Sequence, residues 1–185
     1  MSRLWLFALV LLPLWGTAAE SADAWQALRE GRAVLLMRHA TAPGTGDPAN
    51  FRLGQCETQR NLNAQGRTEA RRWGELLARQ GIERPRLLSS RWCRALDTAS
   101  GMQRGPVHPF AALDSFFGRP EDGVEQTAEL IRLINELPGG APLVLVSHQV
   151  NITALTGIFP ASGEGLILSL PLRSRAEPLA RIPAP

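Results

Sequence analysis

The sequence predicts a single α/β domain, a three-layer α/β/α sandwich in which helices cover both faces of a mostly parallel sheet. Short apolar runs, typical of strands buried on both faces, alternate along the chain with longer segments of helical periodicity. Arginine, serine or histidine follows directly after three of these runs. Strands that alternate with helices form such sandwiches, and ligands bind beyond the carboxyl ends of the strands. The pattern therefore predicts both the fold and the place of its site.

The first residues have the three-part pattern of a secretory signal peptide. A short positive start, Met1–Arg3, precedes the apolar run Leu4–Trp15 and the small residues Thr17–Ala19. The run is shorter than the about 20 apolar residues of a spanning helix, so an uncleaved anchor is the second interpretation. We expect a signal peptide at 1–19, one domain at 20–185, no membrane span after cleavage, and a periplasmic or secreted protein.

The first half of the domain contains two helices around a strand and a long loop. A short helix over Ala24–Glu30 ends at a glycine, and Ala33–Met37 is too short for a buried helix but right for a strand. The segment Ala40–Leu62, rich in Gly, Pro and Asn, is a loop. Asn63 then caps an amphipathic helix that runs through Gln80.

The middle of the chain continues the alternation. Arg86–Ser90 predicts a second strand, and a helix from about Arg91 to Met102 follows it directly. Val107–Phe110 is a short third strand, after which the chain is irregular as far as Gly123.

The last part of the chain contains the clearest buried strand. A helix over Val124–Leu137 precedes this strand, Pro142–Ser147, whose centre is an unbroken aliphatic run. A short helix or turn over Val150–Gly157 then leads to two terminal strands, near Leu166–Leu170 and Pro178–Ile182.

Composition excludes several classes of protein. With 44% hydrophobic and 20% charged residues, the chain has the composition of a globular domain rather than a disordered one. All of its basic side chains are arginines, and the net charge is +3. Because the arginines are spread along the chain without clusters, we predict no binding to nucleic acid. The three histidines and two cysteines match no usual zinc spacing, so we predict no metal site.

The residues that follow the apolar strands are suited to binding phosphate. The three strands lead into Arg38-His39, Ser89-Ser90 and Ser147-His148, and Arg94 lies one turn into the helix after the second. If the strands are neighbours, two imidazoles and two guanidiniums meet at one edge of the sheet. The planar fork of arginine offers paired donors to a phosphoryl group, and helix starts beside the strand ends add backbone N–H groups.

Four motifs in this order resemble those of the histidine phosphatase superfamily, which includes the cofactor-dependent phosphoglycerate mutases. They are Arg38-His39-Ala40 after a strand, Leu62-Asn63-Ala64-Gln65-Gly66 at a helix start, the segment Ser89–Ala99, and Val146-Ser147-His148. The third is similar to the pattern Ser-Ser-x-x-x-Arg-Ala-x-x-Thr-Ala almost throughout. Asn63 stands where relatives have Thr, and Gln149-Val150 where many have a Gly pair. The resemblance implies a phosphoglycerate mutase-like fold.

The resemblance also implies a role for each matching residue. His39 would be the nucleophile that forms a phosphohistidine, while Arg38, Arg94 and His148 would hold the phosphoryl oxygens. These cations would replace a metal, and no cofactor is implied. Arg60, in the loop after His39, is a candidate for substrate binding.

The general acid is assigned by a looser match. The mutase branch has a Glu a few residues before a Gly, and Asp114 is the counterpart here, with Glu121 as the second candidate.

These roles predict a metal-independent phosphatase that acts on a small phosphorylated substrate. Export and short length resemble the small periplasmic branch that includes the lipopolysaccharide core heptose phosphatase, which suggests an envelope sugar phosphate as substrate. Two alternatives stay open: a non-catalytic periplasmic binder of phosphorylated glycans, and a phosphoglycerate mutase-like phosphotransferase. The sequence indicates no oligomeric state.

Cys56 and Cys93 are the only two cysteines, and both remain after signal cleavage. Because the expected destination is oxidising, we predict that they form a disulfide. Two reduced, buried thiols are the alternative.

Overall fold

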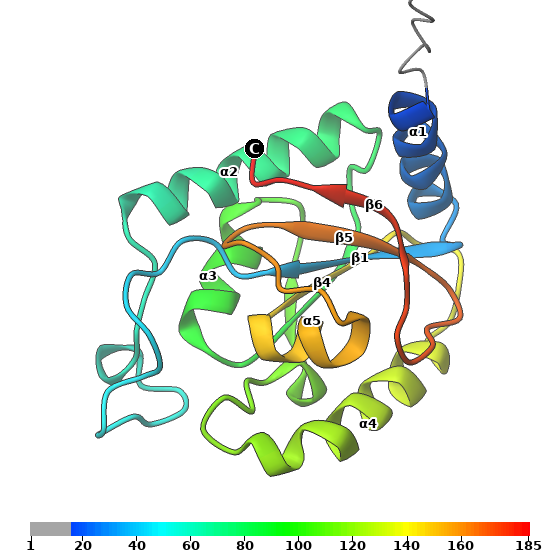
Figure 1. Ribbon diagram of the computed structural model, residues 1–185. Helices are drawn as coiled ribbons and strands as arrows, with labels where there is room; N and C mark the ends of the chain where they lie inside the picture. Colours follow the sequence, from blue (N-terminus) through cyan, green and yellow to red (C-terminus); the bar gives the residue numbers. More distant parts are fainter. Residues whose placement is uncertain (1–15) are drawn as a thin grey trace, which may run out of the picture.

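A computed structural model of the protein describes residues 16–185, so residues 1–15 of the predicted signal peptide lie outside the described residues. One sheet has the strand order β3-β2-β4-β1-β5-β6, and Figure 1 labels the part of it from β4 to β6. The pairs β1–β4, β4–β2 and β2–β3 are parallel, whereas β5 and β6 are antiparallel to their neighbours. The predicted mostly parallel sheet is confirmed. The strands are β1 Ala33–Arg38, β2 Arg86–Ser89, β3 Val107–Pro109, β4 Leu143–Ser147, β5 Gly165–Ser169 and β6 Pro178–Ile182.

Five α-helices connect or flank these strands in the described part of the chain. Within about two residues, four of them match the predicted helices, whereas the first begins at Gly16, well before the predicted start at Ala24. None of the helices within residues 16–185 has the length and apolar character that crossing a bilayer requires. The helices are α1 Gly16–Arg29, α2 Ala64–Arg79, α3 Cys93–Gly101, α4 Gly123–Asn135 and α5 Gln149–Thr156.

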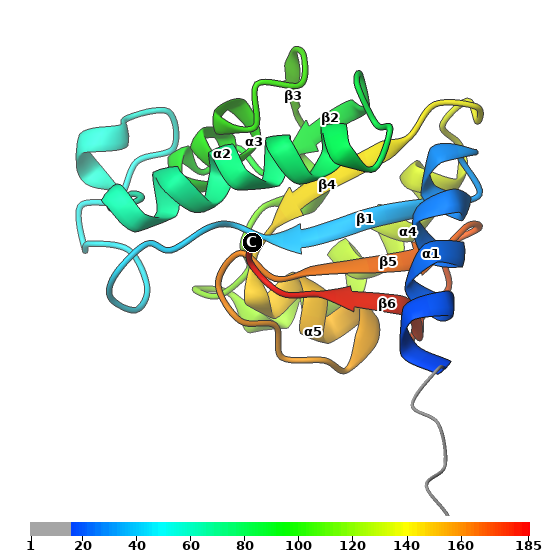
Figure 2. The ribbon, with the colours of Figure 1, turned by 90° about the horizontal axis from the view of Figure 1, so that it is seen from above.

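The helices form a layer on each face of the sheet, which completes the predicted three-layer sandwich. Alternate side chains of β1 separate into two cores, with Leu35 and Met37 on one face and Val34 and Leu36 on the other. The first core packs against α1, α2 and α3, the second against α4 and α5. Figure 2 shows the sheet between α2 and α3 on one side and α5 on the other. Burial on both faces explains the unbroken apolar runs of the central strands.

The two long loops contain only short 3-10 helices. One of these, Cys56–Thr58, lies in the loop after β1, and the other two, Ala111–Leu113 and Pro120–Asp122, lie between β3 and α4. The loop after β1 ends at Asn63, whose side chain accepts a hydrogen bond of 2.8 Å from the Gly66 N–H and caps α2 as predicted.

Helix α2 lies against α3 at a glycine. A Cβ placed on Gly74 would come within 1.9 Å of the Met102 carbonyl oxygen, at the end of α3. Two helices can pack this closely only where one of them has no side chain. We therefore assign Gly74 a packing role that α2's helical propensity alone would not predict.

Gly74→Ala should destabilise the protein by about 1–3 kcal/mol, because overpacking outweighs the gain of about 1 kcal/mol that alanine normally brings to a helix. Gly118→Ala is the control, since an added Cβ there meets nothing within 4 Å. Urea unfolding measures both variants. Equal stability of the two would show that α2 and α3 shift apart without cost.

Candidate active site

Two histidines and a serine meet where three neighbouring strands end. His39 follows β1, His148 follows β4 and Ser90 follows β2. Both imidazoles are buried, and their ring centroids lie 5.4 Å apart in an edge-on arrangement. The structure thus brings together the strand ends that sequence analysis singled out, because β4 lies between β1 and β2 in the sheet.

The hydrogen bonds of His39 fix its tautomer. Its Nδ1 lies 2.8 Å from the Ala40 carbonyl oxygen, which can only accept, so Nδ1 carries the proton. Nε2 therefore holds a lone pair, and Arg94 Nε donates to it at 3.2 Å. Burial, followed by the positive charge of Arg94, lowers the pKa of His39 to about 3. His39 is neutral at physiological pH.

A cavity of about 300 Å³ opens beside the two histidines. Three arginines line it, and Asp47 is the only carboxylate that lines it in the described part of the chain. Phe117 and Phe159, both more than half exposed, stand at its rim. The remaining lining residues come from the loop after β1, the start of α5 and the segment after Asp114: Gly44, Thr45, Gly46, Ser115, Gln149 and Val150.

Arg38 has donors that no described residue uses. It is half buried, and Nη1 donates to the Pro160 carbonyl oxygen at 3.0 Å. Its Nε is buried without a hydrogen-bond partner among the described residues. A buried N–H without a partner is costly, so an anion in the cavity would be stabilised there.

Arg60 lines the cavity, and two of its five N–H groups donate to carbonyl oxygens of the loop. Its Nε donates to the Gly46 carbonyl oxygen at 2.9 Å, and Nη1 donates to that of Ala42. Burial and the neighbouring Arg94 lower the pKa of Arg60 to about 10, which leaves it charged at neutral pH. Arg60 thus shapes the loop and adds positive charge to the cavity.

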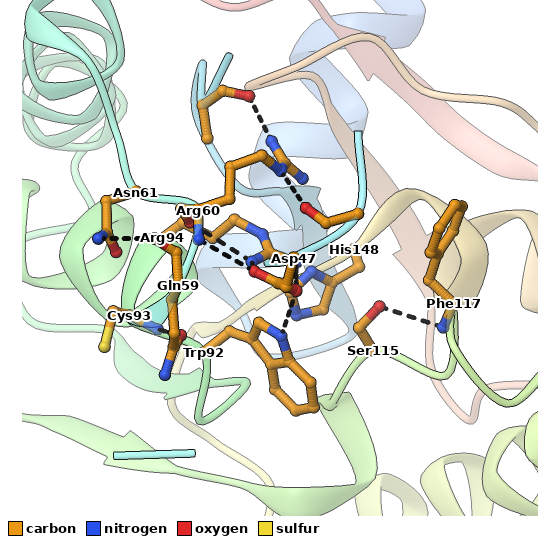
Figure 3. A network of polar contacts seen from close by, with 12 residues as sticks. Asp47, Gln59, Arg60, Asn61, Trp92, Cys93, Arg94, Ser115, Phe117 and His148 are labelled. Carbon is orange, nitrogen blue, oxygen red and sulfur yellow. Dashed lines mark hydrogen bonds and ion pairs between the residues drawn. The ribbon is translucent and has the colours of Figure 1, made fainter. Parts of the chain in front are cut away.

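Arg94 reaches the cavity with its guanidinium already paired. It forms an ion pair with Asp47, with Nη1–Oδ1 at 2.7 Å and Nη2–Oδ2 at 3.2 Å. Figure 3 shows Asp47 between Arg94, Arg60 and Trp92, with His148 close by. Sequence reasoning missed Asp47. The signal that could have found it is an acidic residue in the Gly-Asp-Pro turn of the loop that follows His39.

Hydrogen bonds link the ring of His148 to Ser90 and, through Ser90, to Asp114. Its Nε2 lies 2.7 Å from Ser90 Oγ, and that hydroxyl donates to Asp114 Oδ1 at 3.3 Å. Ser90 Oγ therefore links the His148 ring to the Asp114 carboxylate. Burial, then the neighbouring His39 and arginines, lower the pKa of His148 well below its ordinary value.

Asp114 does not line the cavity. Its carboxylate accepts from the Arg91 backbone N–H at 2.8 Å and from Arg91 Nε at 2.7 Å, in an ion pair. Glu121, the second candidate for the general acid, lies in an exposed 3-10 helix and does not line the cavity either. The acid role of both residues stays a prediction.

Cys56 and Cys93 are joined in a disulfide, the pairing that the sequence predicted. It ties the loop after β1 to the first residue of α3, one position before Arg94. Gln59 Oε1 adds a second link, because it accepts from the Cys93 N–H at 2.9 Å. The loop that carries Asp47 and Arg60 is thereby fixed to the helix that carries Arg94.

Comparison with known proteins points to one family. A family model described as the histidine phosphatase superfamily, branch 1, matches residues 34–122. No curated protein matches the chain. The matched segment includes three of the four motifs on which the resemblance to that superfamily rests.

Solved structures of low sequence identity share the fold. The protein histidine phosphatase SixA complexed with tungstate has a TM-score of 0.57 and 19% identity, over 82% of this chain and 97% of that one. A mycobacterial glucosyl-3-phosphoglycerate phosphatase complexed with VO3 has 0.55 and 18%, over 80% and 98%. Bacillus stearothermophilus YhfR has 0.54 and 16%, over 79% and 94%. At these identities the likeness shows the fold.

The lowered pKa of His39 predicts acid sensitivity. The unfolded chain binds a proton below about pH 6.5, whereas the folded protein does so only near pH 3, so stability falls as the pH drops between these values. From pH 7 to pH 5, His39 should contribute a loss of about 2 kcal/mol. Urea unfolding at both pH values measures it. His39→Asn should reduce the loss, and His108→Asn, at an exposed site, should not. A His39 variant with the full loss would contradict the assignment.

The disulfide should stabilise the fold by about 3–4 kcal/mol, because it closes a loop between cysteines 37 positions apart in the unfolded chain. The double variant Cys56→Ser with Cys93→Ser should lose this amount in urea unfolding. Reductant should have the same effect on the wild-type protein and none on the double variant. A wild-type midpoint that does not respond to reductant would refute the prediction.

Proposed function

We propose that the protein is a phosphatase that hydrolyses a small phosphorylated substrate through a phosphohistidine on His39. The observation that carries the proposal is the state of this imidazole: neutral, locked by Ala40, and with the Nε2 lone pair beside a cavity lined by three arginines. A buried neutral imidazole with an unprotonated Nε2 is a nucleophile, and the surrounding cations stabilise charge on a transferring phosphoryl group.

The reaction has two displacements. The Nε2 lone pair attacks phosphorus, and the bond to the leaving oxygen breaks as that oxygen takes up a proton from a water molecule. A water molecule then attacks the phosphohistidine, the P–N bond breaks, and its electron pair returns to Nε2 while the proton of the water passes to the surrounding solvent. Arg38 supplies unpaired donors to the phosphoryl oxygens, and His148 faces the same group with its ring held by Ser90.

The alternatives use the same residues differently. A binder of phosphorylated glycans would need the arginines but would gain nothing from a neutral His39 oriented by Ala40. A phosphoglycerate mutase-like enzyme is compatible with the chemistry, but its glycolytic substrates are not expected outside the cytoplasm. The N-terminal pattern and the disulfide support export to the periplasm or beyond.

Two substrate classes are the first to test. Export favours an envelope sugar phosphate, by resemblance to the small periplasmic branch. The geometry favours phosphoramidates as well, because neither predicted acid lines the cavity and the only carboxylate that does, among the described residues, is paired with Arg94. An imidazole leaves more easily without a proton donor than an alkoxide does. A panel of sugar phosphates, aryl phosphates and a phosphoramidate, given to the protein without residues 1–19, distinguishes the classes.

His39→Ala should abolish turnover and leave the fold intact, because it removes the nucleophile. Rapid quench at alkaline pH should trap an acid-labile phosphohistidine at position 39 of the wild-type protein. His108→Ala is the matched control and should keep full activity. Turnover by His39→Ala at the wild-type rate would refute the mechanism.

Asp114→Asn tests the two roles open to this carboxylate. We infer that Asp114 is a positioning residue that acts through Ser90 on His148, so the substitution should lower turnover by similar factors on alkyl and aryl phosphates. Its effect on the pH profile should equal that of Ser90→Ala. A loss confined to alkyl phosphates, whose leaving oxygen needs a proton, would instead identify Asp114 as the general acid.

A further inference from the structure

Asp47 is a carboxylate in a cavity otherwise lined by positive and neutral side chains. It belongs to the loop after β1 and lies 13 residues before Arg60 and 47 before Arg94. Its side chain is 16% exposed. The proposed reaction gives this carboxylate no role, because a phosphoryl group, itself negative, must bind in the same cavity.

Four hydrogen bonds hold this carboxylate in place. Oδ1 accepts from Arg94 Nη1 at 2.7 Å and from the Arg60 backbone N–H at 3.1 Å. Oδ2 accepts from Arg94 Nη2 at 3.2 Å and from Trp92 Nε1 at 2.9 Å. Each oxygen thus accepts from two donors. Figure 3 shows these contacts around Asp47.

Trp92 is itself fixed beside the cavity. Its ring stacks on Phe51, with centroids 5.1 Å apart, and forms a T-shaped pair with the ring of His148, with centroids 5.5 Å apart. The donor that Trp92 offers to Asp47 is therefore preorganised.

The ion pair uses the face of Arg94 that would bind phosphate. A guanidinium has five N–H groups. Nε donates to His39, Nη1 donates to Asp47 and approaches the Arg60 carbonyl oxygen at 3.4 Å, and Nη2 donates to Asp47. One N–H remains. Because two oxygens of one anion already occupy the paired donors, a phosphoryl group cannot take the same two bonds while Asp47 stays.

A proton-donor role for Asp47 does not fit these contacts. Burial raises the pKa of Asp47, but hydrogen bonds from Arg94 and the Arg60 N–H outweigh burial, and the net shift is downward. The carboxylate is ionised at neutral pH and has no proton to give to a leaving group. Its geometry is that of a carboxylate that stands in for an anionic ligand.

We propose that Asp47 is a resident anion that occupies the fork of Arg94 in the empty enzyme and is displaced by the incoming phosphoryl group. This inference rests on the proposed function, because it takes the phosphoryl site to lie at His39 and Arg94. The carboxylate neutralises part of the charge of Arg38, Arg60 and Arg94 while the cavity is empty. An anion enters only if it binds the fork better than Asp47 does, which favours a phosphoryl dianion over a monoanion and speeds the release of phosphate.

Titration of inorganic phosphate into the purified protein tests this displacement by calorimetry. Asp47→Asn keeps the shape of the side chain but removes its charge, and Asp47→Ala removes the competing group. Both variants should bind phosphate at least about tenfold more tightly than the wild type. Asp122→Asn, at a partly exposed aspartate of the 3-10 helix Pro120–Asp122 outside the cavity, is the matched control and should bind phosphate as the wild type does. Urea unfolding confirms that each variant is folded.

The outcomes separate the displacement from the proposed function. Unchanged or weaker phosphate binding by both Asp47 variants would overturn the displacement and make Asp47 a residue that positions Arg94. Tighter binding without turnover by the wild type on the substrate panel would uphold the displacement at an anion site and overturn the phosphatase. If neither the wild type nor a variant binds phosphate, both are wrong.

Discussion

Backbone hydrogen bonds between β1, β4 and β2 hold the residues of the site at one edge of the sheet. The ladder continues past the strand ends, since the His39 N–H donates to the Ser147 carbonyl oxygen and the Ser90 N–H to that of Val146, both at 2.9 Å. A change of register by one residue would turn every side chain of a strand to the opposite face of the sheet. Because the strands are buried on both faces, the register is fixed by packing. The position of the two imidazoles is thus a consequence of the apolar cores.

Positive charge and burial then set the chemistry of the edge. Arginines from β1, the following loop and α3 surround two imidazoles that have no carboxylate partner of their own, so both stay neutral. A carboxylate beside a histidine raises the pKa of the imidazole, whereas here burial and the neighbouring arginines lower it. The one carboxylate in the cavity, among the described residues, pairs with Arg94 instead. The disulfide keeps the loop that carries this carboxylate close to α3. The carboxylate therefore offsets part of the positive charge of the three arginines.

The sequence predicts those features that depend on local patterns. Apolar runs locate β1, β2 and β4, and Asn63 locates the start of α2, because burial and capping act over a few residues. Contacts between residues far apart in the sequence leave no local pattern from which they could be predicted. The pairing of Asp47 with Arg94 joins an irregular loop to a helix, and Arg91 draws the carboxylate of Asp114 away from the cavity. The start of α1 was missed because its first residues belong to the predicted signal peptide.

The central claim is that phosphate passes through His39 in two displacements. The most direct measurement is the configuration at phosphorus after hydrolysis of a thiophosphate monoester made chiral with oxygen isotopes. Each in-line displacement inverts phosphorus, so a phosphohistidine pathway predicts overall retention. Overall inversion would mean that water attacks the substrate directly. His39 would then be a general base or a structural residue, and the two-displacement mechanism would be wrong.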